Sequence, residues 1–206
     1  MQKWKWYVLL LSSGWAQPAK KPPKWDTLVV IETPKGVMKL QLYRETPIHR
    51  SNFFRLAQAQ FYDSTTFHRV VPGFVIQGGD PNSRDADPTN DGMGGPGYTL
   101  PAEIRLDLKH TLGAVGAARL GDAVNPTRAS NGSQFYIVVA PQGTPFLDGS
   151  YTVFGRVLEG IEVAKALSQV ERDERDRPRE SLPMRVRLER HKVRLLRQRY
   201  GDGYKL

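Results

Sequence analysis

The chain has 206 residues, of which 39% are hydrophobic, and a formal net charge of +9. This composition suffices for one well-packed core, and the chain lacks the run of about eighteen apolar residues that would predict a membrane-spanning helix. Cysteine is absent, which excludes disulfides, thiolate catalysis, cysteine-based zinc sites and a lipidated cysteine anchor.

The first residues have the pattern of an export signal, in which lysines precede a short apolar run and small residues follow it. These features are Lys3, Lys5, the run Trp6–Leu11, Gly14 and Ala16. We therefore expect a signal peptide over residues 1–16 and export to the periplasm or the extracellular space. If the N-terminus is not a signal, the protein is cytoplasmic. Residues 17–26 are rich in Pro and Lys and are expected to form a linker.

A β-hairpin and a helix are predicted next. Residues 28–32 are an apolar run, residues 33–36 (TPKG) have the composition of a turn, and residues 37–43 alternate apolar with polar side chains. Thr46 followed by Pro47 predicts a helix start with Thr46 as the N-cap.

Short strands and glycine-rich loops follow, with a second helix predicted after Gly160 from the spacing of its apolar residues. The expected strands are residues 74–77, 113–118, 134–139, 152–157 and a closing strand at 184–189. Many short strands with two helices predict a mainly β fold, either a barrel or a sandwich. We place the folded domain at residues 27–190 and expect a basic C-terminal tail, or a short basic helix, over residues 191–206. The last 36 residues, 171–206, carry 12 basic and 7 acidic side chains.

Few kinds of catalysis are open to these residues. None of the four histidines forms a His-x-His or His-x-x-x-His pair, so we expect neither a metal site nor a cofactor. The glycine-rich run 91–97 lacks the ending of a phosphate-binding loop. Ser133 has no flanking sequence typical of a nucleophile elbow.

Two strands bring polar groups beside apolar ones. Counting by twos along residues 67–80 (FHRVVPGFVIQGGD) places Arg69, Val75 and Gln77 on one face. In the later strand the same rule places Gln134 and Tyr136 together and turns Phe135 and Ile137 into the core. The sequence therefore predicts an apolar patch edged by a guanidinium and amides.

Residues 67–80 closely resemble the signature of the cyclophilins, a family of peptidyl-prolyl cis-trans isomerases. The resemblance continues, in the family's order, through residues 108–111 (LKHT), 131–137 (NGSQFYI), 146–149 (FLDG) and 153–155 (VFG). It implies an eight-stranded antiparallel β-barrel capped by two α-helices, in a monomer. It also implies catalysis of rotation about X-Pro peptide bonds, with proline-containing polypeptides as clients and, in an exported protein, a role in the folding of exported chains.

The resemblance also implies the roles of individual residues. Arg69 would be the catalytic hydrogen-bond donor, Gln77 would position the substrate backbone, and His68 and His110 would be hydrogen-bonded structural residues. The catalytic set is Arg69, Phe74, Gln77 and Tyr136, and the substrate-binding set is Val75, Ala118, Arg119, Gln134, Phe146, Leu147 and Tyr151.

Four of these residues depart from the best-known members of the family. Val75, Tyr136, Phe146 and Tyr151 stand where those members have Met, Phe, Trp and His. Because Phe146 lacks an indole N–H, we expect only weak binding of the cyclic peptide cyclosporin. The loop at residues 120–130 is also longer than in compact members, and either adjusts which chains enter the groove or is a solvent loop without a role.

Two further hypotheses come from other functional classes. One is a chaperone or scaffold that binds proline-containing chains without turnover. The other is a nucleic-acid binder that uses the basic residues between Arg185 and Arg199. That segment has little aromatic interleaving, so we expect no nucleic-acid partner and favour a solvated basic face.

Overall fold

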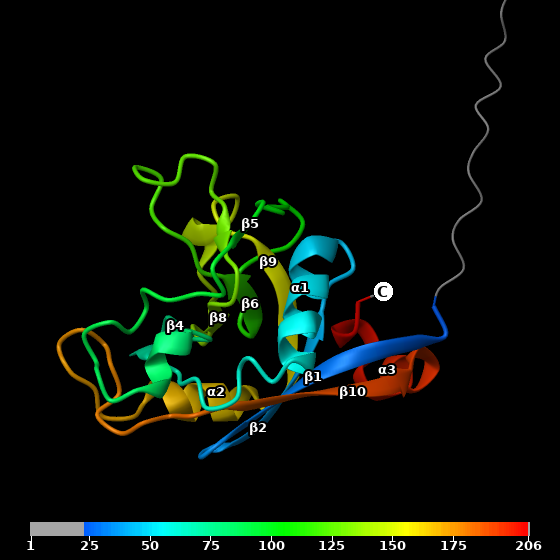
Figure 1. Cartoon of the computed structure of the whole chain (residues 1–206). Coiled ribbons are helices and arrows are strands. Elements are labelled where there is room, and N and C mark those ends of the chain that lie inside the picture. The colour runs from blue at the N-terminus through cyan, green and yellow to red at the C-terminus, as the bar shows by residue number, and fades with distance from the viewer. Residues whose placement is uncertain (1–22, 206) are drawn as a thin grey trace, which may run out of the picture.

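Ten strands and three α-helices form within residues 23–205, the part of the chain that the computed structural model describes (Figure 1). The strands are β1 (Trp25–Thr33), β2 (Gly36–Leu42), β3 (Arg69–Val71), β4 (Val75–Gly78), β5 (Thr99–Leu100), β6 (Ala114–Ala117), β7 (Ser130–Asn131), β8 (Phe135–Val138), β9 (Val153–Glu159) and β10 (Arg185–Lys192). The α-helices are α1 (Pro47–Gln58), α2 (Ile161–Ser168) and α3 (Val193–Tyr200), and short 3-10 turns are found at Pro81–Arg84, Pro145–Leu147 and Gly201–Gly203. The predicted signal peptide and most of the predicted linker lie outside the described residues.

Eight of the strands form one sheet in the order β10-β1-β2-β9-β6-β8-β4-β3, and every pairing in it is antiparallel. Strands β5 and β7 form a separate two-stranded sheet. The prediction of a mainly β fold with eight antiparallel strands is therefore confirmed, as are the two helices expected after Thr46 and Gly160.

Backbone hydrogen bonds hold the two edges of this sheet together just ahead of its edge strands β3 and β10. The amide of Ser64 donates to the carbonyl of Met184 at 3.0 Å, and the amide of Met184 donates to the carbonyl of Thr65 at 2.8 Å. The amide of Phe67 donates to the carbonyl of Leu182 at 3.0 Å. Residues 64–67 and 182–184 thus link the edges, and the sheet wraps around its core.

The strands β4 and β8 in this sheet are buried on both faces, and they supply alternate residues to two hydrophobic clusters. The main cluster lies between the sheet and helices α1 and α2, and it contains Ile76 of β4 with Phe135 and Ile137 of β8. The second cluster contains the intervening residues. Its members are Val75, Leu108, Ala114, Tyr136, Val138, Ala140 and Val153. The expected separation of Tyr136 from its two neighbours in the strand is confirmed, and Tyr136 belongs to the second cluster.

Helix α1 begins at the expected place, but the side chain of Thr46 does not cap it. The Thr46 hydroxyl donates back to the carbonyl of Tyr43, at 3.4 Å. The carboxylate of Glu103 instead accepts the amides of Ile48, at 3.1 Å, and His49, at 2.9 Å. A carboxylate is a stronger hydrogen-bond acceptor than a hydroxyl, and its negative charge is stabilised by the positive end of the helix dipole.

The C-terminal segment is built into the fold. The boundary that the sequence placed at residue 190 lies inside β10, which runs to Lys192. Helix α3 follows directly, and Val193, Leu196 and Tyr204 form a small buried cluster with Leu28 of β1. None of the helices in the described part of the chain is long and apolar enough to cross a membrane.

Candidate active site

Four neighbouring strands align one row of residues on the face of the second cluster. Arg69 of β3 is paired with Gln77 of β4, Gln77 with Tyr136 of β8, and Tyr136 with Gly116 of β6. Paired residues in an antiparallel sheet point to the same face. The register therefore brings the guanidinium, the amide and the aromatic ring together, as the alternation of the sequence predicts.

A cavity of about 240 Å³ lies over this row. Its lining consists of Arg69, Phe74, Val75, Gln77, Ala118, Arg119, Tyr136, Leu147 and Tyr151. All nine belong to the residues that the sequence selected for the catalytic and substrate-binding sets. The lining holds no carboxylate, imidazole, thiol or aliphatic hydroxyl, so its polar groups are suited to donating hydrogen bonds rather than to transferring protons.

The two remaining predicted residues, Gln134 and Phe146, lie beside the cavity. Gln134 is 4% exposed and accepts a hydrogen bond from the Gln77 side chain at 3.0 Å. Its own amide donates to the carbonyls of Gly92, at 3.0 Å, and Gly94, at 2.7 Å. Gln134 therefore fixes the orientation of Gln77. Phe146 is 72% exposed, and its ring stacks on that of Phe74 with the centroids 5.7 Å apart.

The floor of the cavity is anchored by a buried hydrogen-bonded chain. The hydroxyl of Tyr136 lies 2.8 Å from Nε2 of His110, and Nδ1 of His110 lies 2.8 Å from a carboxylate oxygen of Asp148. Burial raises the pKa of Tyr136 and lowers the pKa of His110, so both groups are neutral at physiological pH. The carboxylate of Asp148 then accepts a hydrogen bond from Nδ1–H, and Nε2 accepts one from the hydroxyl of Tyr136. His110 thus has the expected structural role.

Gly116 provides the space that the Tyr136 ring occupies. A Cβ atom at residue 116 would lie 2.5 Å from Cε2 of Tyr136 and still closer to Cζ and the hydroxyl oxygen, far inside contact distance. Sequence reasoning did not select Gly116. The importance of Gly116 follows from the pairing of β6 with β8, and neither strand's own sequence reveals that pairing.

Arg69 is held from the far end of the chain. Its Nη2 lies 3.6 Å from a carboxylate oxygen of Asp176, and the amide of Val70 donates to the carbonyl of Asp176 at 2.8 Å. The carboxylate of Asp173 accepts the amides of Arg175 and Arg177 and so shapes this loop. Asp176 follows the last block of the cyclophilin resemblance, and nothing in the local sequence points to it.

The loop at residues 120–130 is tied to the rim of the cavity. Asp122 lies 2.6 Å from Nη1 of Arg119 and 2.8 Å from Nη2 of Arg128. The guanidinium of Arg119 stacks over the ring of Tyr151, 4.3 Å from its centroid, and Arg128 donates to the carbonyl of Gly149 at 3.0 Å. These contacts place the loop beside the cavity.

A second cavity, of about 540 Å³, shares Arg69 and Gln77 with the first and is otherwise lined mainly by two loops, 88–92 and the highly charged 173–179. His68 also lines it and is buried, but neither of its ring nitrogens has a hydrogen-bond partner among residues 23–205. Only a weak contact with the backbone of Thr66 remains, and the expectation that His68 is hydrogen-bonded stays a prediction. Burial lowers the pKa of His68 to about 4, so the ring is neutral.

Comparisons with known proteins agree on one family. The family model described as "Cyclophilin type peptidyl-prolyl cis-trans isomerase/CLD" matches residues 28–187. A peptidyl-prolyl cis-trans isomerase of Arabidopsis thaliana is 39% identical over 91% of this chain and 99% of its own length. Another, from Schizosaccharomyces pombe, is 43% identical over 75% of this chain and 93% of its own.

A solved structure gives the same result. The cyclophilin type peptidyl-prolyl cis-trans isomerase of Cryptosporidium parvum, crystallised in the presence of the dipeptide Ala-Pro, superposes with a TM-score of 0.69. It is 29% identical in sequence, and the match covers 79% of this chain and 98% of that one.

The contact between Gly116 and Tyr136 leads to a stability prediction. Gly116→Ala should lower the free energy of unfolding by about 1–3 kcal/mol, because the added methyl group must displace a buried ring. Gly121→Ala is the matched control, since no atom lies within 4 Å of a Cβ placed there. Urea denaturation of both variants measures the difference. Equal stability of the two would mean that the Tyr136 ring does not lie against Gly116.

Proposed function

This chain belongs to the cyclophilin-type peptidyl-prolyl cis-trans isomerases and is an isomerase of that class, and on this premise we propose that the 240 Å³ cavity binds the proline of the substrate while Arg69 donates a hydrogen bond to the prolyl nitrogen. The observation that carries the proposal is the composition of that cavity. The guanidinium of Arg69 and the oriented amide of Gln77 border an apolar floor, and no carboxylate, imidazole or thiol is among the lining residues.

The reaction requires a donor and a pocket, and no proton transfer. An X-Pro bond has partial double-bond character and a rotational barrier of roughly 18–20 kcal/mol. When the bond twists, the nitrogen regains a localised lone pair. A donor aimed at that lone pair interacts more strongly with the twisted amide than with either planar isomer, so it lowers the barrier.

The surroundings of Arg69 support its assignment as that donor. The hydrogen bond from Val70 holds the adjoining loop against β3, and this places the carboxylate of Asp176 3.6 Å from the guanidinium of Arg69. Gln77 is oriented in turn by Gln134. A donor that is already oriented needs no reorganisation as the bond twists. We therefore assign Gln77 the role of positioning the substrate backbone.

The proline ring would lie on the apolar side of the same cavity. Phe74, Val75, Tyr136 and Leu147 supply that side, and the anchored hydroxyl of Tyr136 keeps its ring flat over Gly116. Phe146 continues the wall outward by stacking on Phe74.

Residues that precede proline would lie along Ala118 and Arg119. No backbone hydrogen bond of Arg119 is found within residues 23–205, so its amide and carbonyl are available to an extended substrate chain. Its guanidinium is already engaged by Asp122 and Tyr151. Binding through the backbone accepts many different side chains and suits an enzyme that acts on polypeptides of varied sequence.

We also propose that the enzyme is exported and assists the folding of exported proteins. The support is the order of residues 1–16, in which two lysines, a short apolar run and small residues succeed one another. N-terminal sequencing of the protein from its native host should begin at Gln17, in a fraction outside the cytoplasm. An intact Met1 in a cytosolic fraction would assign the enzyme to the cytoplasm instead.

Replacement of Arg69 tests the proposed mechanism. Arg69→Ala should lower kcat/KM for a short X-Pro peptide by about 10²-fold, the usual effect of losing one oriented transition-state donor. A protease-coupled isomerisation assay measures it. Arg105→Ala is the control, because Arg105 is an exposed arginine paired with Asp107 outside the cavity. An Arg69→Ala enzyme as active as this control would show that another residue carries the reaction.

The side chain at residue 146 should affect inhibition by cyclosporin more than it affects catalysis. Phenylalanine provides the apolar surface but no donor, whereas a tryptophan N–H adds one hydrogen bond, worth about 1 kcal/mol, or roughly five-fold in affinity. Phe146→Trp should therefore tighten cyclosporin binding by about that factor and leave turnover nearly unchanged. Inhibitor titrations of both enzymes decide the matter, and equally tight inhibition of the two would remove Phe146 from the inhibitor site.

A further inference from the structure

A cationic surface surrounds an exposed tryptophan where β1 begins. We call it the Trp25 patch, and it consists of Lys24, Trp25, Arg190, Lys192, Arg194 and Arg197. Trp25 is 42% exposed, and the five cationic residues are exposed as well. A cavity of about 580 Å³ opens here, lined by Pro23 and Val193 together with Trp25 and four of the cations, and no acidic residue lines it.

Backbone pairing brings these residues together from both ends of the chain. Trp25 is paired with Lys192 across β1 and β10, and the amide of Val193 donates to the carbonyl of Lys24 at 3.1 Å. The guanidinium carbon of Arg190 lies 4.9 Å from the centroid of the Trp25 ring, and Nζ of Lys192 lies 5.7 Å from it. Two cations therefore lie beside a single indole ring.

Helix α3 adds two more arginines to this surface. It buries Val193 and Leu196 against β1, so Arg194 and Arg197, one turn apart, are left exposed. The packing that holds the helix thus determines which of its cations face outward.

The charges of the patch are not neutralised by the protein. Within residues 23–205 none of its five cations forms a salt bridge, whereas nearby Arg187 pairs with Glu32 and Arg199 with Glu159. Five such cations around one ring repel one another and attract anions. The surface is therefore suited to an anionic partner that lies outside the described part of the chain.

We propose that the Trp25 patch binds the surface of a bilayer that contains anionic phospholipids. Tryptophan next to Lys and Arg is the composition found where proteins meet the membrane interface, and clustered cations bind anionic headgroups. Nucleic acid fits less well, because non-specific strand binding uses several aromatic platforms in succession and this patch offers one.

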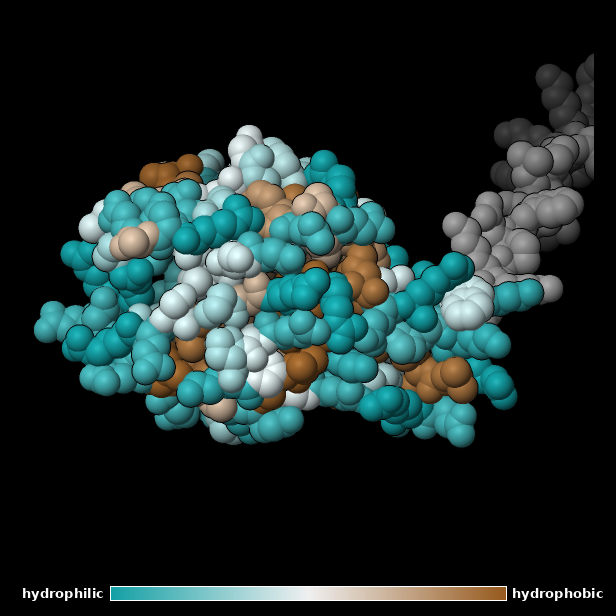
Figure 2. Space-filling view, turned by 60° about the horizontal axis from the view of Figure 1, so that its bottom comes forward, coloured by the Kyte–Doolittle hydropathy of each residue, from teal (hydrophilic) through white to brown (hydrophobic). Residues whose placement is uncertain are grey.

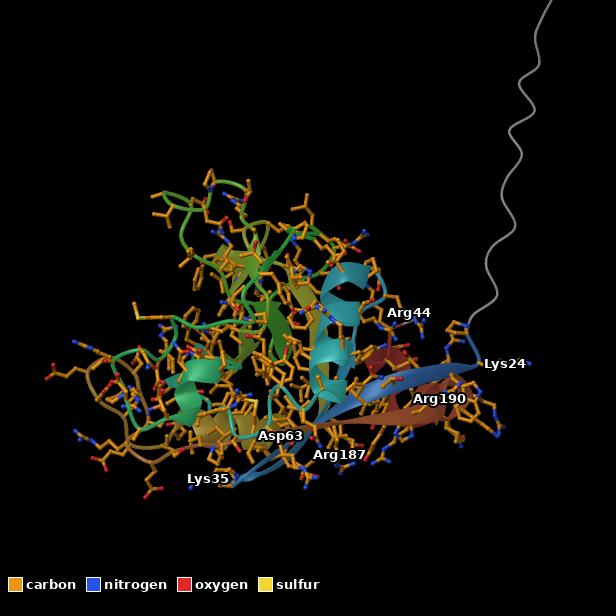
Figure 3. All side chains as sticks on the ribbon, viewed as in Figure 1. Lys24, Lys35, Arg44, Asp63, Arg187 and Arg190 are labelled. Atoms are coloured by element: carbon orange, nitrogen blue, oxygen red, sulfur yellow. The ribbon has the colours of Figure 1, made fainter. Side chains whose placement is uncertain are left out.

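The position of the patch leaves the active site open. Lys24 and Arg190 lie at the end of the molecule where β1 begins and α3 packs, whereas β4 and the loop at residues 171–181 lie toward the opposite end (Figures 1 and 3). The space-filling view shows that hydrophilic residues cover most of the surface next to the first described residues (Figure 2). An enzyme bound through the patch would present its isomerase cavity away from the bilayer.

Vesicle sedimentation tests the proposal with the full chain. Binding to vesicles of phosphatidylglycerol and phosphatidylcholine should exceed binding to phosphatidylcholine alone and should fall as salt is added. The variant Arg190→Gln, Arg194→Gln, Arg197→Gln should lose on the order of 100-fold in affinity for the anionic vesicles, since each cation near such a surface contributes about five-fold. Trp25→Ala should also weaken binding without any change of charge.

The matched control is the triple variant Lys35→Gln, Arg105→Gln, Lys165→Gln, which removes the same charge outside the patch. It should bind anionic vesicles nearly as well as the unmodified chain, and all variants should keep their isomerase activity, which shows that they fold. If both triple variants lost affinity for the vesicles equally, net charge alone would explain the binding, and the proposal would be overturned. Tighter, patch-dependent binding to single-stranded RNA than to vesicles would overturn it as well. Failure of the proposed isomerase mechanism would leave the vesicle results unaffected.

Discussion

The alternation of side chains along β4 and β8 is the constraint on which both the core and the cavity depend. Ile76, Phe135 and Ile137 turn into the main cluster, while Val75 and Tyr136 turn to the other face and form the floor of the site. A shift of one residue in the register would exchange these sets, burying Gln77 and exposing the core residues. The packing that stabilises the sheet therefore also fixes the geometry of the site.

Groups outside the lining of the cavity hold that geometry. The floor depends on the chain from Tyr136 through His110 to Asp148, and the amide at its edge depends on Gln134. Tyr136 stands where the best-known members of the family have phenylalanine. It keeps the aromatic surface, and its hydroxyl donates a hydrogen bond to the buried His110. A neutral hydroxyl and a neutral imidazole satisfy each other at little cost, because neither buries a charge.

Much of the site was predictable for two reasons. Alternation by two places Arg69, Val75 and Gln77 on one face, and the resemblance of short, contiguous motifs to the cyclophilins implies the other residues of the site. Nine of the selected residues line one cavity. The missed contributions all come from long-range contacts: Glu103 at the start of α1, Gly116 beneath Tyr136 and Asp176 beside Arg69. Each depends on which segments become neighbours in space, and a propensity or a local pattern carries no such information. The short basic helix that the sequence offered as an alternative to a tail does form, but its packing against the domain was missed for the same reason, since its apolar partner is Leu28.

The strand order has a consequence for how the chain is made. β1 lies between β2 and β10, so the first strand of this sheet to be synthesised acquires its second partner only after Lys192 has left the ribosome. Until then one edge of an apolar strand offers unpaired amides and carbonyls, which other chains can extend into an aggregate. Pairing over so long a sequence separation is also slow to form. This isomerase therefore completes its own sheet late, and it is most exposed to aggregation while β10 is still missing.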